Sequence, residues 1–165
     1  MNRFQSLLVR GRIPLLLGFL ALGGAYSIDE DYRTPGKSWW ATELINSEDQ
    51  ERAIAGGPVD VMVTHDSPEG VDIPTLRRWA PIPKSQANRE RLLEVVKAVR
   101  PLYLTHGHYH DRYSDKLRFV VDADADGNLV WHEVQIEGVG ADMSPTREAS
   151  YVFDTEAFRA ARPGA

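Results

Sequence analysis

Two short apolar segments, residues 59–63 and 102–104, each run directly into a polar cluster that contains histidine. The segment between them, residues 86–100, carries apolar residues at helical spacing and is followed by a proline. The order is therefore strand, helix, strand, with polar side chains after each strand. In open α/β sheets, ligand sites lie beyond the carboxyl ends of the strands. The pattern predicts an α/β fold with its functional residues directly after these two strands.

The rest of the chain predicts further short elements. They are a strand at 19–22, a helix at 47–55 capped by Ser47, strands at 117–121 and 129–136, and a last short helix at 156–161. Ser85 is expected to cap the 86–100 helix. An Asp-Gly turn separates the last two strands, which predicts a hairpin. At 165 residues, the whole chain is expected to form one domain.

Residues 1–25 admit two interpretations. Arginines precede an apolar run and small residues follow it, which is the outline of a secretory signal peptide. Alternatively, residues 19–22 form a covered strand that ends at Gly-Gly. The apolar run is too short to span a bilayer, so no membrane partner is expected. We predict a cytoplasmic protein, with secretion as the alternative if residues 1–25 are a signal peptide.

Composition excludes several classes of function. The chain has no cysteine, which rules out disulfides, thiolate zinc sites and thiol nucleophiles. Its net charge is −5, and no run of lysine or arginine is present to neutralise a nucleic-acid backbone. Nucleic acid is therefore expected only as a substrate. Sites built from histidine and carboxylate remain open.

The histidines supply the strongest candidate site. His65 follows the first of the two strands, and His108 and His110 follow the second. In an extended segment, residues two apart face the same side, so His108 and His110 are expected to reach one metal site together. Neutral imidazole suits zinc or iron, and nearby carboxylates also admit manganese. His106 is expected to be a strand-end residue and His132 an exposed hairpin residue, both without a role.

Two motifs carry a resemblance to a known family. Gly107-His108-Tyr109-His110 after a strand, with Thr64-His65-Asp66 after an earlier strand, resembles the last two motifs of the calcineurin-like metallophosphoesterases of phage and bacterial type. The stretch from Leu22 to Ser27 is also similar to that family, as are three features that follow it: Arg33, Gly36 and Ser38-Trp39-Trp40. The resemblance covers about residues 19–142.

The resemblance implies a four-layer α-β-β-α sandwich, of which this chain would form the C-terminal portion. Residues 1–18 would be an atypical leader and residues 144–165 a tail. In that family, His65 and His108 would bind one metal of a binuclear pair and His110 the other, with manganese, iron or zinc as the metals. Arg33 is a candidate for pairing with a phosphate oxygen of the substrate. Trp39 and Trp40 would either line the substrate pocket or cover the sheet.

Three motifs of the family are missing from this sequence: Asp-x-His, Gly-Asp and Gly-Asn-His. They would supply the carboxylate that bridges both metals and the histidine that protonates the leaving group. We therefore expect an N-terminally truncated, incomplete domain with weak or no hydrolysis of an unidentified phosphoester. Its exposed sheet edge would be covered by a second copy or by a partner. The alternatives are a domain completed by another chain and a non-catalytic remnant used for binding.

A second pattern lies in residues 122–133. Its acidic residues, Gly127 and Glu133 match the spacing of an EF-hand calcium loop. An EF-hand loop needs a helix on each side, whereas the flanking residues favour strands. An acidic hairpin turn is the preferred interpretation, with calcium binding through residues 122–133 as the alternative.

Overall fold

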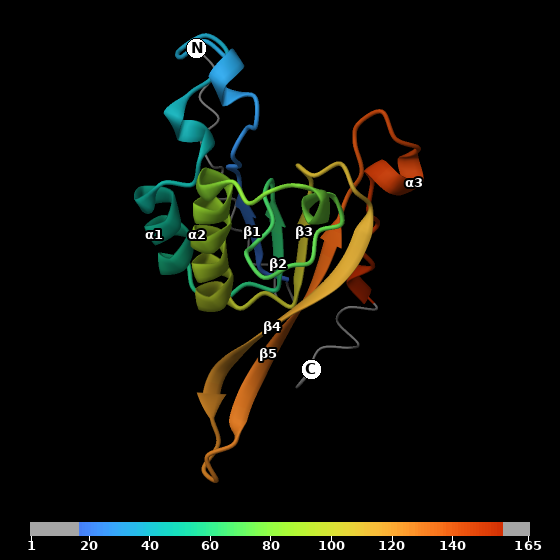
Figure 1. The fold of residues 1–165 in the computed structure, drawn as a ribbon. Helices are drawn as coiled ribbons and strands as arrows, with labels where there is room; N and C mark the ends of the chain where they lie inside the picture. The colour runs from blue at the N-terminus through green and yellow to red at the C-terminus, as the bar shows by residue number, and fades with distance from the viewer. Residues whose placement is uncertain (1–16, 157–165) are drawn as a thin grey trace.

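Five strands form one sheet in the order β1-β2-β3-β5-β4 (Figure 1) in the computed structural model, which describes residues 17–156. The strands are β1 (Phe19–Leu22), β2 (Val61–Thr64), β3 (Tyr103–His106), β4 (Tyr113–Ala123) and β5 (Leu129–Gly138). Neighbours among β1, β2, β3 and β5 pair in parallel, and β4 pairs antiparallel with β5 at one edge. The predicted α/β class is confirmed.

Helix α1 (Ser47–Ala55) has the predicted bounds but a different cap. The side chain of Asn46 accepts a hydrogen bond from the backbone N–H of Asp49 at 2.9 Å, so Asn46 is the N-cap. Ser47, which the sequence favoured as the cap, is the first helical residue. Both residue types cap well, and the sequence alone could not choose between neighbours.

Helix α2 (Pro83–Val99) begins earlier than predicted. Pro83 occupies the first turn, where its missing N–H leaves no helical hydrogen bond unmade. Ser85 therefore lies inside the helix, and the expectation that it caps the helix is wrong. Arg100 ends the helix in the left-handed conformation, directly before Pro101. Four short helical turns complete the described structure: η1 (Glu30–Tyr32), η2 (Ala41–Glu43), η3 (Thr75–Arg78) and α3 (Thr146–Ala149).

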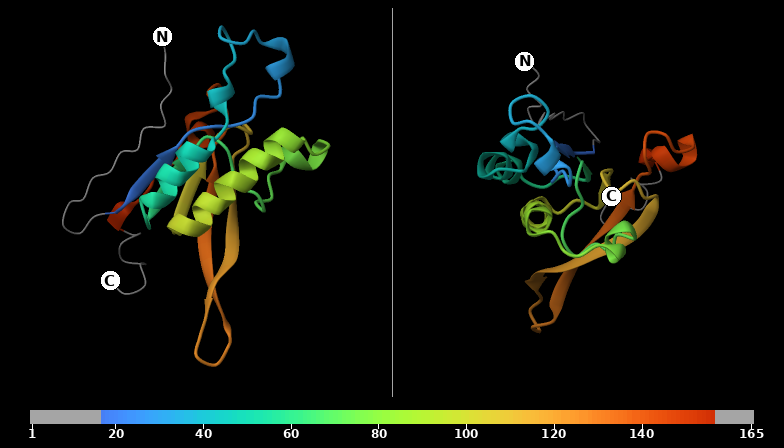
Figure 2. Two further views of the ribbon diagram at one scale, coloured as in Figure 1. Left: turned by 90° about the vertical axis from the view of Figure 1, so that its left-hand side faces the viewer. Right: turned by 45° about the horizontal axis from the view of Figure 1, so that its top comes forward.

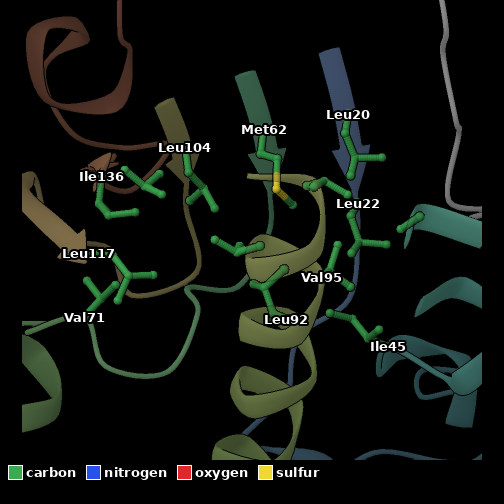
Figure 3. Packing of buried hydrophobic residues seen from close by; sticks show 14 of the residues in the cluster. Leu20, Leu22, Ile45, Met62, Val71, Leu92, Val95, Leu104, Leu117 and Ile136 are labelled. Carbon is green, nitrogen blue, oxygen red and sulfur yellow. The ribbon is translucent and has the colours of Figure 1, made fainter. Parts of the chain in front are cut away.

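The main core lies between α2 and the sheet. Leu92, Val95 and Val96 of α2 are fully buried. Met62 of β2 and Leu104 of β3 belong to the same hydrophobic cluster (Figure 3). Helices α1 and α2 lie side by side on this one face (Figure 2). Burial of these aliphatic side chains is the main force that fixes α2 across the parallel strands.

The opposite face of the sheet is covered in part by the segment that follows α3. The ring of Tyr103 stacks on Tyr151 with centroids 5.3 Å apart and contacts Phe153 at 5.0 Å. Phe19 and Val63, on the same face, each remain 45% exposed. Within residues 17–156, β1 pairs with β2 alone and therefore forms the second edge of the sheet. Coverage of this edge by a second copy or a partner stays a prediction.

Strands β4 and β5 form a long hairpin that extends beyond the rest of the sheet (Figure 1). Asp124 accepts hydrogen bonds from the backbone N–H groups of Asp126 and Asn128, at 3.0 and 2.8 Å. Gly127 adopts a φ of +83°, which glycine tolerates without strain. The predicted hairpin with an Asp-Gly turn is confirmed.

Residues 19–22 form β1, as the strand interpretation of the leader predicted. The preceding residues 1–16 lie outside the described part of the chain, as does most of the helix predicted at 156–161. Among residues 17–156, no helix combines the length and apolar character needed to cross a membrane.

Candidate functional site

The carboxyl ends of three parallel strands meet at one edge of the sheet. Leu22 of β1 pairs with Thr64 of β2, and Thr64 pairs in turn with His106 of β3. These three residues are the last of their strands. The segments that leave the strands therefore start side by side. One of them begins with Gly23, the next with His65 and the third with Gly107.

His65 and His108 lie in contact at this edge. Their ring centroids are 5.1 Å apart, with the planes at 61°, an edge-to-face arrangement. His65 is exposed and His108 is half-buried. The two imidazoles follow different strands and are 43 residues apart in the sequence, so the fold alone brings them together. His110 is exposed, and its charge lowers the pKa of His108.

The backbone of Tyr26, in the segment that leaves β1, lies beside the ring of His108 and acts to raise its pKa. Histidines that bind metals almost always bond through their other ring nitrogen to a carbonyl or carboxylate, because that bond fixes the tautomer and the orientation of the ring. Burial lowers the pKa of His108, and the neighbouring His65 lowers it further, while the carboxylate of Asp66 raises it. The net lowering favours the neutral imidazole that a metal ion requires.

The backbone of the Gly-His-Tyr-His segment is not extended. His108 and His110 have φ angles of +69° and +59°, in the left-handed region. The backbone N–H of Tyr109 donates to the carbonyl of Gly107 at 2.9 Å, which closes a tight turn between them. The expectation that this segment is extended is therefore wrong, whereas a shared metal site for His108 and His110 stays a prediction. The chain turns at each histidine, and Tyr109 points inward between them.

A buried carboxylate lies beneath the histidines and was not singled out as a site residue from the sequence. Asp66 has no solvent exposure, although it directly follows the exposed His65. It accepts hydrogen bonds from the Tyr109 hydroxyl at 2.5 Å and from the Asn88 side chain at 2.7 Å. The only signal in the sequence is a single Asp at the end of a buried strand, and neither partner is local.

The histidines do not form a closed metal site as they stand. Among the residues that the structure describes, no three His, Cys, Asp or Glu side chains are grouped so as to hold a metal ion. A cation bound by His65, His108 and His110 together therefore needs rotation of side chains. The exposure of His65 and His110 leaves both free to rotate.

Arg33 is engaged within its own loop. Its Nε donates to Asp29 at 2.8 Å, and Nη1 lies 3.5 Å from a carboxylate oxygen of Glu43. The bond to Asp29 raises the pKa of Arg33. Contact between Arg33 and a substrate phosphate stays a prediction. Trp40 is about half exposed in this loop, at 48%, and the choice between lining a substrate pocket and covering the sheet stays open for Trp39 and Trp40.

Of the two histidines outside the motif, His132 differs from expectation. It is half-buried, its Nε2 lies 2.8 Å from the carbonyl of Pro101, and its ring contacts Phe119. It therefore fastens the hairpin to the end of α2 instead of facing solvent.

Glu133, the last position of the calcium-type pattern, pairs with Lys116 at 2.7 Å. Asp124 accepts backbone hydrogen bonds within the hairpin turn. Two of the carboxylates that a calcium loop would need are therefore already paired with other groups.

His106 is the last residue of β3, as expected, and is 2% exposed. Its Nε2 lies 2.6 Å from the hydroxyl of Tyr113, and its Nδ1 lies 2.9 Å from the carbonyl of Gly107. Burial lowers the pKa of His106 to about 4. The imidazole is therefore neutral at pH 7 and links β3 to β4.

This pKa predicts acid sensitivity. Because the folded pKa is about 4 and the ordinary value is 6.5, the unfolded chain binds the proton more tightly. The contribution of His106 to stability is fully present above pH 6.5 and falls as the pH drops toward 4. Between pH 7.5 and 4.5 we expect a loss of about 2–3 kcal/mol from this residue. Urea unfolding with EDTA, at both pH values, measures it.

The matched variant is His106→Gln, which keeps polar contacts but does not titrate. Its loss of stability between the two pH values should be smaller than that of the wild type by about 2 kcal/mol. An equal loss in both proteins would contradict the assignment to His106.

The chain matches no protein-family model, and no curated protein shows a significant match to it.

Proposed function

We propose that this chain is a metallophosphoesterase-like domain that binds a divalent metal ion through His65, His108 and His110. The observation that carries the proposal is the 5.1 Å contact between the rings of His65 and His108. Ligand sites of parallel α/β sheets lie at this edge, and two imidazoles from adjacent strands give a cation two nitrogen donors. His110 would supply the third.

The donor set indicates which cations to test. Imidazole nitrogens suit zinc and iron, and manganese becomes favourable where carboxylates take part. When bound, such a cation supplies Lewis acidity toward a phosphoryl oxygen. The residues of this chain would hold and orient it, and the backbone of Tyr26 lies beside the ring of His108. The exposure of His65 and His110 leaves the site open to a phosphoester from solvent.

The fold supports the same proposal. One face of the sheet is covered by α1 and α2, which corresponds to one α-β half of a four-layer α-β-β-α sandwich. The other face leaves Phe19 and Val63 partly exposed, at 45% each. Apolar side chains of this kind suit packing against a second sheet. On this basis we propose that the fold is part of a four-layer α-β-β-α sandwich.

Calorimetric titration with zinc, repeated with manganese, tests the metal site. The wild type should bind at least one cation, and His108→Ala should lower the affinity at least tenfold, because loss of even an outer-shell partner costs roughly 10–100-fold. His132→Ala is the matched control, since His132 bonds to Pro101 and lies outside the motif. The metal site is refuted if the wild type gives no heat of binding or if His108→Ala binds as tightly as the wild type.

Hydrolysis by this chain is expected to be weak. Two-metal phosphoesterases generate a hydroxide nucleophile and clamp the phosphoryl oxygens between two cations. Three imidazoles without a bridging carboxylate supply too few ligands for two tightly held cations. With manganese, bis-p-nitrophenyl phosphate should therefore be hydrolysed at close to the rate without protein. Robust turnover that His108→Ala abolishes would show that the chain is a competent enzyme.

A further inference from the structure

We propose that Asp66 is a positioning residue of the histidine site, which acts by holding Tyr109 and thereby the turn that carries His108 and His110. This inference rests on the proposed metal site. It assigns a role to a residue that does not itself touch the cation and that follows one of the three proposed ligands directly.

The bonding of Asp66 supports the assignment. Both carboxylate oxygens are used: Oδ1 accepts from the hydroxyl of Tyr109 at 2.5 Å and from the backbone of Ser67 at 2.8 Å, and Oδ2 accepts from Asn88 at 2.7 Å. A fully buried carboxylate is stable only with several such bonds. Asp66 therefore joins the ends of β2 and β3 to helix α2 at one point.

Asn88 extends the same network to the third strand end. Its Oδ1 accepts the backbone N–H of Ile45 at 2.9 Å, and its Nδ2 also lies 3.3 Å from the carbonyl of Gly24. Asn88 is 3% exposed, so these bonds form in a region of low dielectric where each is strengthened. The segment that presents the backbone of Tyr26 to His108 is thus tied to the same carboxylate.

The turn that carries the histidines needs such an anchor. His108 and His110 both adopt positive φ angles, +69° and +59°, which are unfavourable for residues with a Cβ by roughly 1–2 kcal/mol each. Conformations of this kind persist only where the surroundings determine them. Tyr109 is the residue between the two, and it is 9% exposed. Its hydroxyl is the part of the turn that reaches Asp66.

A second contact, from Thr75, holds the backbone of the same turn. The hydroxyl of Thr75 lies 3.3 Å from the carbonyl of Tyr109 and also bonds to the carboxylate of Asp111. The backbone of the turn is therefore fixed by η3, while the side chain of Tyr109 is fixed by Asp66. Removal of the tyrosine hydroxyl alone should loosen the orientation of the histidines and leave the fold intact.

The test compares Tyr109→Phe with Tyr113→Phe. Each change deletes one phenolic hydroxyl, but the hydroxyl of Tyr109 bonds to Asp66 in the buried interior, whereas that of the half-buried Tyr113 bonds to His106. Both variants should lose a similar, modest amount of stability. Zinc affinity should fall at least fivefold in Tyr109→Phe and stay within twofold of the wild type in Tyr113→Phe. The visible absorption of bound cobalt, which reports coordination geometry, should change in Tyr109→Phe alone.

The outcomes separate this inference from the proposed function. If the wild type binds no zinc, the metal site fails, and this inference fails with it. If the wild type binds zinc and Tyr109→Phe matches it in affinity and cobalt spectrum, the metal site stands and the role of Asp66 is refuted. Equal losses of affinity in both tyrosine variants would make the network purely structural and also refute the role.

Discussion

Replacing Leu92 by alanine is expected to destabilise the fold by about 3 kcal/mol, because the change leaves a cavity at the centre of the core. Leu92 has no solvent exposure and belongs to the cluster that joins α2 to the sheet. Figure 3 shows its side chain pointing toward the strands. Deletion of its three terminal carbons removes apolar contacts that the surrounding strands cannot restore without moving. Urea unfolding at pH 7.5 measures the change in free energy.

Leu93→Ala is the matched control in the same helix. Leu93 is only partly buried against the core, so the same chemical change should cost about 1 kcal/mol. A smaller loss for Leu92→Ala than for Leu93→Ala would contradict the packing of α2. The comparison also bears on function, since the same helix carries Asn88 one turn earlier.

Local patterns were sufficient for the elements of this fold but not for their order in the sheet. The apolar spacing of residues 86–100 and the Asp-Gly turn at 126–127 each depend on neighbouring residues, and both elements form, although α2 begins at Pro83. The position of β5 beside β3 depends on pairing between residues about 32 positions apart, such as Tyr103 with Gln135. No periodicity in one segment contains that information. Because β5 lies beside β3, its hairpin partner β4 takes the edge of the sheet.

At the candidate site, too, some features could be predicted from the sequence and others depend on contacts between distant residues. The meeting of His65 and His108 follows from one general rule, that parallel strands end at a common edge. The conformation of the turn at residues 107–110 cannot be predicted from its own residue types, because the left-handed φ angles of His108 and His110 are imposed by contacts of Tyr109 with distant residues. The role of Asp66 was missed for the same reason. Its partners Asn88 and Tyr109 lie 22 and 43 residues away.

The two adjacent glycines after β1, Gly23 and Gly24, have different roles in the structure. Gly24 has a φ of +114°, and a Cβ added there would lie 2.9 Å from the side chain of Ile45 and 3.0 Å from its backbone nitrogen. Gly23 has nothing within 4 Å of the corresponding position. Only Gly24 is therefore required by close packing and by its backbone conformation.

Gly24→Ala is accordingly expected to destabilise the chain by about 2–4 kcal/mol, the combined effect of a strained φ and of overpacking against Ile45. The carbonyl of Gly24 also lies 3.3 Å from Nδ2 of Asn88, so any displacement of this backbone disturbs the network of Asp66 and the segment that orients His108. Zinc affinity should therefore fall even under conditions where the variant is folded.

Gly23→Ala, the same change one residue earlier, should alter stability by less than about 1 kcal/mol and leave zinc affinity unchanged. Urea unfolding and calorimetric titration of both variants decide the matter: similar behaviour of the two would show that the loop after β1 does not support the histidine site.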